Sequence, residues 1–220
     1  MKMKNKRIQK RGAKRGGAAA FISLLAALLT MAVFAVAQQE DETESGAPQT
    51  FQYTLADRFA VPWPGGKSLR MSEGEGQIFV RASSAEAVTF RASKTAFAPD
   101  LAKAREFASR IKVFAQAPAD SVVATSSIPS SAGLEVSGRV DYDILAPAAI
   151  SVDLATTSGA IDVSGLEGEA KVKTDSGKIR LSNIKGAAQA SSSSGNIDIK
   201  DCSKISLIRN GSGEVSFQAS

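Results

Sequence analysis

Apolar and polar residues alternate with a period of two through most of the chain after residue 50, which is the pattern of β-strands with one buried face. The clearest steps place one residue between two apolar ones: Leu69/Met71, Ile78/Val80, Val88/Phe90, Ile111/Val113 and Ile150/Val152. One segment departs from this pattern, because helix-forming residues fill 101–108 and Pro99 and Asp100 provide a start signal. We therefore expect a chain of strands interrupted by one short helix near 99–109.

In the last third of the chain the alternation is tied to a fixed interval of 18 residues. Ser-Gly pairs begin at Ser158, Ser176, Ser194 and Ser212, and an apolar-x-apolar step follows each pair. These steps are Ile161/Val163, Ile179/Leu181, Ile197/Ile199 and Val215/Phe217. A period of this kind is typical of stacked structural units. We expect each unit to supply two short strands and two turns, and to stack about 4.8 Å from its neighbour.

Other positions of the unit, counted from the residue after each Ser-Gly pair, indicate which side chains face inward. The seventh position holds Leu166, Ile184 and Cys202, which we expect to face the core. Ser206 and Ile208 are expected to face inward as well. The ninth position holds Gly168 and Gly186, for which a tight corner with positive φ is the expected reason.

Outward positions carry charges whose sign alternates from unit to unit. The third position reads Asp162, Arg180 and Asp198, and the eighth reads Glu167, Lys185 and Ser203. Opposite charges on neighbouring strands stabilise a sheet by about 0.2–1 kcal/mol per pair, so this pattern indicates stacking in register. The predicted fold class is all-β, a β-solenoid of about 18-residue coils with a short helical insertion. The alternative is a β-sandwich whose hairpins are evenly spaced.

The fourth unit stops at Ser220, after a single strand. A stack that ends there would have an uncovered strand edge, which invites pairing with another chain. The sequence is therefore expected either to be truncated or to have this edge covered by the earlier part of the chain or by a partner. An open edge would permit edge-to-edge self-association.

The first 37 residues hold eight basic residues and no acid, and residues 18–37 carry no charge. With the small-x-small end Ala35-Val36-Ala37, this predicts a secretory signal peptide. An uncleaved anchor helix at 18–37 is the alternative, since about twenty apolar residues span a bilayer. In both cases we expect the remainder to be exported to the periplasm, the cell surface or the medium. Residues 38–50 predict an acidic disordered linker.

The remaining organisation follows from the pattern. Residues 51–139 form the N-terminal β-rich part, and residues 140–220 form the regular repeat.

The formal net charge of +5 arises in the leader, because the residues after 37 contain 19 basic and 22 acidic side chains. The apparent basicity is therefore no evidence for nucleic-acid binding, and we expect no nucleic-acid partner.

The run VDYDILAPAAISVDLATTSGAI at 140–161 joins two alternating strands through a Pro-Ala corner and ends in Ser-Gly-x-Ile. It resembles the bacterial putative-adhesin β-solenoid domain family, and IDVSGLEGEAKVKTDSGKIRLSNIKG at 161–186 is similar to the repeats of that family. The resemblance covers about 69–220. It implies an exported β-solenoid with no catalytic activity to carry over.

Composition excludes much of enzyme chemistry. The chain has no histidine, which removes Ser-His-Asp and Cys-His arrangements and the commonest transition-metal ligand. Its single cysteine, Cys202, makes neither an internal disulfide nor a thiolate zinc site. We expect Cys202 to be a small buried apolar residue.

Three short motifs suggest chemistry, and each has a simpler structural explanation. The segment 65–68 (GGKS) echoes the end of a P-loop, but Val61 stands where the first glycine is required. The pair Ser182 and Lys185 has the Ser-x-x-Lys spacing, without the companion motifs. The carboxylates Asp141, Asp143 and Asp153 could suggest calcium, yet they alternate with apolar residues as a solvated face does. We therefore predict no catalytic, cofactor or metal site.

Trp63, between Pro62 and Pro64, is expected to pack as a cap over the first coil, although a surface tryptophan could stack on a sugar or anchor a partner.

The export signal, the repeat and the lack of catalytic motifs together predict a non-catalytic cell-envelope or surface scaffold that binds an unknown envelope protein or glycan through its strand faces or open edge. The alternatives are a regulatory partner in envelope-stress signalling and a carbohydrate-active β-helix enzyme. Contact with the membrane is expected only through the N-terminal segment.

Overall fold

The computed structural model describes residues 49–63, 65–66, 68–131 and 135–219, and all of them lie in one compact unit. The expected signal peptide or anchor at 1–37 and nearly all of the linker at 38–50 lie outside these residues. None of the helices within the described ranges has the length and apolarity needed to cross a membrane.

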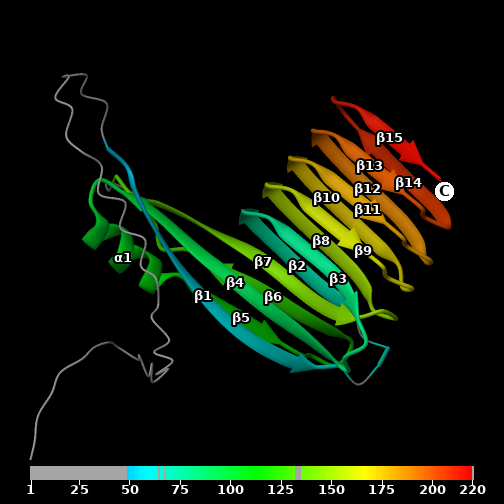
Figure 1. Cartoon of the computed structure of the whole chain (residues 1–220), viewed down its shortest axis with the longest axis horizontal. Coiled ribbons are helices and arrows are strands. Elements are labelled where there is room, and N and C mark those ends of the chain that lie inside the picture. Colours follow the sequence, from blue (N-terminus) through cyan, green and yellow to red (C-terminus); the bar gives the residue numbers. More distant parts are fainter. Residues whose placement is uncertain (1–48, 64, 67, 132–134, 220) are drawn as a thin grey trace, which may run out of the picture. The chain divides into compact units, whose positions relative to one another are not determined.

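The described residues form two β-sheets and one short helix, so the all-β prediction is confirmed. The eight-stranded sheet, here called sheet A, has the order β1-β4-β7-β3-β9-β11-β13-β15 (Figure 1). Its strands are β1 Phe51–Pro62, β4 Ala87–Ala98, β7 Ser137–Pro147, β3 Ile78–Ser83, β9 Ile161–Ser164, β11 Ile179–Ser182, β13 Ile197–Lys200 and β15 Val215–Gln218. The sequence boundary placed at 139/140 falls inside β7.

The seven-stranded sheet, here called sheet B, has the order β14-β12-β10-β8-β2-β6-β5. Its strands are β14 Lys204–Asn210, β12 Ala187–Ser194, β10 Ala170–Ser176, β8 Ser151–Ser158, β2 Ser68–Glu75, β6 Ser121–Ser127 and β5 Lys112–Gln116. From β8 onward the chain alternates between the sheets. One strand of sheet B and the strand of sheet A that follows it are here called a rung.

Successive rungs pair in parallel, and paired residues differ by 18 positions: Val152 lies beside Ala170, and Ala170 beside Ala188. Sheet A keeps the same offset, with Ile161, Ile179 and Ile197 side by side. Apolar residues of both sheets fill the space between them. Ile161, Leu166, Ile179 and Ile184 have no exposed surface.

One rung is out of sequence order. The rung β2–β3 lies between the rung β6–β7 and the rung β8–β9, because β2 pairs with both β6 and β8, and β3 pairs with both β7 and β9. Residues from 68–83 are thereby inserted next to residues from 151–164. The 18-residue period gives no sign of this insertion.

Beyond the parallel rungs, sheet A is extended by antiparallel pairing of β7 with β4 and of β4 with β1. The predicted helix is confirmed as α1, Leu101–Arg110, which follows β4 directly (Figure 1). Its N-cap is Asp100, whose side chain accepts a hydrogen bond from the Lys103 backbone N–H at 2.8 Å. Its buried face, with Ala104, Phe107 and Ala108, contributes to the core beside β1 and β4.

Glycines form a column at the corner where sheet B passes into sheet A. Gly159, Gly177, Gly195 and Gly213 have φ between 109° and 155°. A Cβ on Gly177 would lie 2.1 Å from the carbonyl oxygen of Gly159, and one on Gly195 would lie 2.0 Å from that of Gly177. Only glycine meets both conditions, the positive φ and the close approach of the neighbouring rung. The same column includes Gly76, whose carbonyl oxygen would lie 1.9 Å from a Cβ on Gly159.

The positive φ expected at Gly168 and Gly186 is wrong, because neither glycine has one. Both are required by close packing: a Cβ on Gly186 would lie 2.3 Å from the carbonyl oxygen of Gly168. The left-handed turn comes three positions earlier in the unit, at Gly165, Asn183 and Asp201, with φ of 76°, 52° and 51°. Glycine, asparagine and aspartate are the residues that tolerate this conformation best.

The last rung departs from the predicted inward positions. Ile205 pairs with Ala188, and the register shifts at the next residue, so that Leu207 pairs with Gln189. Ser206 is therefore the extra residue of a β-bulge and is exposed, contrary to the prediction. Its hydroxyl donates to the carbonyl of Ala188 at 3.2 Å.

A row of polar side chains crosses the inner face of sheet B. In register it consists of Glu73, Thr156, Thr174, Ser192 and Asn210. Glu73 is 6% exposed, and its carboxylate accepts hydrogen bonds from the backbone N–H of Ser126 at 3.0 Å and from the Ser126 hydroxyl. Burial raises the pKa of Glu73 above its ordinary value, and these hydrogen bonds only partly oppose the effect.

We predict that Gly177→Ala lowers the free energy of unfolding by about 2–5 kcal/mol, because it combines a disfavoured φ with a backbone clash. The matched control is Gly74→Ala in β2, where a Cβ would meet nothing within 4 Å and φ is not positive. Urea denaturation of both variants measures the difference. Equal effects would contradict the role assigned to the glycine column.

We predict that Glu73→Gln removes a pH-dependent loss of stability. Because the folded-state pKa is raised, the stability of the native protein falls as the pH rises above about 4.5 and levels off beyond the folded pKa. The variant should match the native protein at pH 4 and have the higher Tm at pH 8, where about 1 kcal/mol corresponds to roughly 2–4 °C. Glu75→Gln, at the exposed neighbouring acid, is the control. Parallel Tm curves for Glu73→Gln and the native protein would contradict the prediction.

Candidate functional site

The outer face of sheet A carries a groove of about 610 Å³ over β4, β7, β3, β9 and β11. We call it the sheet A groove. Its lining combines arginines, aspartates and serines with Phe79 and with the backbone side of the buried Tyr142. The residues whose side chains point outward into it are Phe79, Arg81, Arg91, Ser93, Asp141, Asp143, Asp162, Ser164, Arg180 and Ser182.

Strand register places the central residues of the groove in one straight row. Arg91 pairs with Asp143, Asp143 with Phe79, Phe79 with Asp162, and Asp162 with Arg180. Successive members stand on neighbouring strands of one sheet and are therefore about 4.8 Å apart. The row continues beyond the groove to Asp198 and Ser216.

Ion pairs hold the carboxylates of the groove in place. Arg81 contacts Asp143 at 2.6 Å, Arg180 contacts Asp162 at 3.0 Å, and Arg139 contacts Asp141 at 3.2 Å. Such exposed pairs contribute little to stability but fix the direction of the polar atoms. The groove is therefore a preorganised polar surface.

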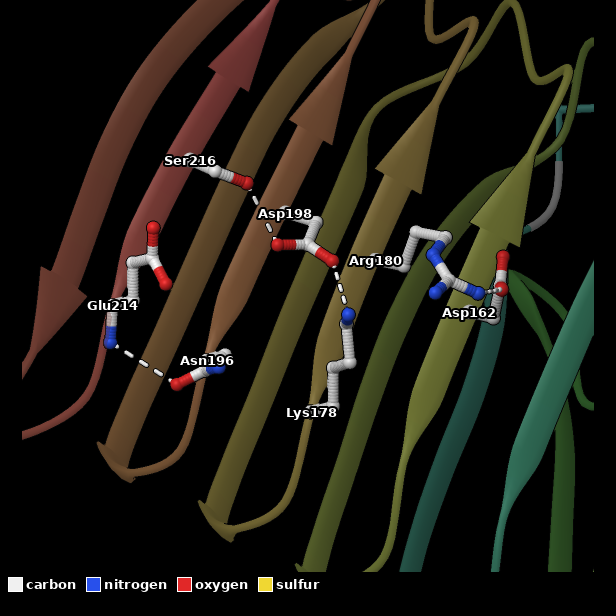
Figure 2. A network of polar contacts seen from close by, with 7 residues as sticks. All are labelled: Asp162, Lys178, Arg180, Asn196, Asp198, Glu214 and Ser216. Carbon is white, nitrogen blue, oxygen red and sulfur yellow. Dashed lines mark hydrogen bonds and ion pairs between the residues drawn. The ribbon is translucent and has the colours of Figure 1, made fainter.

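Beyond the groove the polar network continues over the next rungs, as Figure 2 shows. Lys178 pairs with Asp198, the Ser216 hydroxyl donates to the same carboxylate at 2.7 Å, and Asn196 accepts from the backbone N–H of Glu214 at 3.1 Å. The hydrogen bond from Lys178 is the main reason that the pKa of Asp198 lies below its usual range. The predicted pairing of opposite charges on neighbouring strands is confirmed for Asp162 and Arg180, which are in register and form an ion pair.

The eighth position of the unit also carries an ion pair between neighbouring units. Lys185 contacts Glu167 at 2.7 Å, and this hydrogen bond lowers the pKa of Glu167. In sheet B, Lys171 pairs with Asp153 at 3.3 Å across the same 18-residue offset. Salt links between rungs thus occur on both outer faces.

Phe79 is the aromatic member of the groove, and it lies half-buried between the carboxylates of Asp143 and Asp162. It reaches this place because β3 is inserted between β7 and β9. Sequence reasoning missed Phe79, Arg81 and Arg91, since they lie more than 50 residues away in sequence from the aspartates they face. The outward position of Phe79 between Ile78 and Val80 was the only available signal.

The carboxylates that suggested calcium do not converge. Asp141 and Asp143 lie on β7 in sheet A, whereas Asp153 lies on β8 in sheet B. Each is paired with a basic side chain. Among the described residues, no group of three or more histidine, cysteine or acidic side chains is placed to hold a metal ion.

The other candidate residues also have structural surroundings. Lys185 is engaged by Glu167, so it is not poised to activate Ser182, which lies in the groove. Gly65 and Gly66 form a turn with positive φ, and Lys67 lies outside the described residues. Cys202 is half-buried against the core, and burial raises the pKa of its thiol. Trp63 is partly buried and packs on the same core.

Comparison with known proteins finds a similarity in the C-terminal part of the chain. Residues 121–219 match the model of the family described as Toastrack DUF4097, a domain of unknown function, which confirms the family resemblance seen in the sequence. None of the curated proteins matches the chain. A solved structure of a putative cell adhesion protein from Clostridium sporogenes is 11% identical, with a TM-score of 0.48, and the match covers 76% of this chain and 100% of that one.

A second solved structure, a putative adhesin from Bacteroides fragilis, is 12% identical with a TM-score of 0.29, and the match covers 79% of this chain and 99% of that one.

We predict that Arg180→Gln changes the free energy of unfolding by less than about 1 kcal/mol, because the pair with Asp162 is exposed and screened. The Arg180 side chain is 51% exposed and that of Asp162 is 23% exposed. Ile179→Asp is the contrasting variant and should destabilise the fold strongly. Ile179 has no exposed surface, and the apolar side chains around it cannot form an ion pair or hydrogen bond with a buried carboxylate. Thermal unfolding of both variants tests this. A loss above about 2 kcal/mol in Arg180→Gln would show that the groove cannot be altered independently of the fold.

Proposed function

Taking residues 121–219 as a Toastrack DUF4097 domain, we propose that the chain is a non-catalytic binding scaffold of the cell envelope or cell surface. In this proposal it is a β-solenoid of 18-residue coils, exported by its N-terminal segment, and present in the periplasm, at the cell surface or in the medium. Residues 18–37 serve as signal peptide or membrane anchor. The partner is an envelope protein or glycan, and it binds on the outer face of sheet A.

The observation that carries the proposal is the row Asp143–Phe79–Asp162 in the sheet A groove. An aromatic ring flanked by fixed carboxylates combines a flat apolar surface with directed hydrogen-bond acceptors, which is the chemistry of a recognition site. The groove volume of about 610 Å³ falls in the range of small-molecule sites. Charged residues placed this densely on a sheet face are not needed for the core, which lies on the opposite side of the strands.

The electrostatics of the groove favour binding over catalysis. General acid–base catalysis uses a carboxyl group free to exchange its proton with a substrate. In the groove Asp141, Asp143 and Asp162 are each held by an arginine. The carboxyl with a raised pKa, Glu73, lies between the sheets with 6% of its surface exposed. A substrate on the outer face would not reach it.

The test is binding of the purified protein to an envelope fraction from its host. Ser164→Trp places a large ring in the groove, and Ser72→Trp places the same ring on the outer face of sheet B, where Ser72 is exposed. Both sites are strand positions that accept tryptophan. We expect Ser164→Trp to weaken binding at least about tenfold, equivalent to about 1.4 kcal/mol, and Ser72→Trp to leave it unchanged.

Retained binding in Ser164→Trp would place the partner elsewhere and overturn the assignment of the groove. The non-catalytic part of the proposal has a separate check. The native protein should release no product from a panel of polysaccharides and esters, and turnover that disappears in Asp162→Asn would contradict it.

A further inference from the structure

We propose that the sheet A groove binds an acidic glycan, in which a carboxylate-bearing sugar is linked to a neutral sugar. This rests on the proposed function and specifies its ligand. The carboxylate lies between Arg91, which lines the groove, and Arg58, which stands opposite Arg91 on β1 just beyond the lining. The neutral ring stacks on Phe79.

The two arginines form a cationic end to the groove row. Arg58 on β1 is the direct cross-strand partner of Arg91 on β4, and both are exposed. Like charges directly opposite each other destabilise a sheet. Among the residues that the structure describes, neither guanidinium has an ion-pair partner, although arginines in the same groove are paired. A bound anion between the two would remove their repulsion and form charge-assisted hydrogen bonds with both.

Phe79 stands at a fixed distance from this cationic end. Arg91, Asp143 and Phe79 are consecutive members of one row, so the ring is about 10 Å from Arg91 and one strand further from Arg58. That separation suits two linked sugars, with the acidic one at the arginines and the next over the ring. Asp143 and Asp162, on either side of Phe79, are placed to accept hydrogen bonds from the hydroxyl groups of the stacked sugar.

The same carboxylates exclude other polyanions. A nucleic acid carries a charge at every phosphate, and those beyond the arginines would meet Asp143 and Asp162. The groove favours a ligand with one anionic group at the Arg58 end and neutral hydroxyls over the rest. Its volume of about 610 Å³ is that of a small-molecule site.

The lining also points to a hydroxyl-rich ligand. Apart from Phe79, the outward side chains of the groove are arginine, aspartate and serine. Tyr142, the other aromatic residue at the groove, is 1% exposed and faces the core, so it provides no second stacking surface. A largely apolar ligand would remove these charged and hydroxyl groups from water without offering them hydrogen bonds, which is unfavourable.

The experiment is a calorimetric titration of the purified protein with two pairs of oligosaccharides. The acidic members are glucuronyl-xylobiose and 3′-sialyllactose, and their neutral counterparts are xylotriose and lactose. We expect at least one acidic member to bind about tenfold or more tightly than its counterpart, as charge-assisted hydrogen bonds predict. Arg91→Gln and Arg58→Gln should each reduce that ratio toward one.

Phe79→Ala should weaken the acidic and neutral members alike, by roughly tenfold, because it removes the stacking surface without touching the arginines. Lys173→Gln is the matched control, since Lys173 is an exposed cation on the outer face of sheet B. It should change nothing. The variants are first compared with the native protein by Tm, so that loss of binding is not mistaken for loss of the fold.

Failure of every acidic oligosaccharide to bind, or an acidic-to-neutral ratio unchanged in both arginine variants, would overturn the inference. Competition between the oligosaccharides and the envelope fraction distinguishes failure of this inference from failure of the proposed function. If the protein binds the envelope fraction and Ser164→Trp abolishes that binding, but no acidic oligosaccharide competes, the groove is a binding site for another ligand. If the groove variant still binds the envelope fraction, both proposals fail.

Discussion

The close approach of neighbouring rungs at the glycine corner is the constraint on which the rest of the structure depends. At Gly159, Gly177 and Gly195 the backbone turns with positive φ, and each Cα lies against the carbonyl of the rung before it. A side chain at any of these positions would push two rungs apart. Because the corner repeats at the same place in each rung, the strands that follow it are held in one register, and their outward residues form straight rows across sheet A.

Those rows explain how a structural repeat can also carry a site. Inward positions such as Ile161 and Ile179 are fixed by packing, whereas outward ones such as Asp162 and Arg180 meet only solvent and the next rung. They can therefore be chosen for recognition at little cost in stability. The insertion of β3 between β7 and β9 brings Phe79 into such a row. The groove exists because two distant parts of the chain share one sheet.

The contrast between local signals and long-range strand pairing explains which features the sequence could predict. Local signals were sufficient for helix α1 with its cap at Asp100, for the inward apolar steps from Ile161 to Ile199 and for the pairing of Asp162 with Arg180. In the last of the apolar steps Phe217 is 60% exposed, contrary to the expected inward position. The insertion that places Phe79 depends on long-range pairing, which no local pattern encodes. Corner conformation was assigned to Gly168 instead of Gly165, because glycine serves close packing at one position and positive φ at the other. The column Thr156, Thr174, Ser192 was visible at the 18-residue spacing but carries no strand or turn signal.

We expect the partner of this protein to bind on the outer face of sheet A. Site-specific photocrosslinking in intact host cells tests it most directly, with the reactive group placed at Ser182 in the groove and, for comparison, at Lys173 on the outer face of sheet B. We expect a crosslinked product at Ser182, its loss when Ser164→Trp is added, and no product at Lys173. Equal capture at both positions, or capture at Lys173 alone, would contradict it.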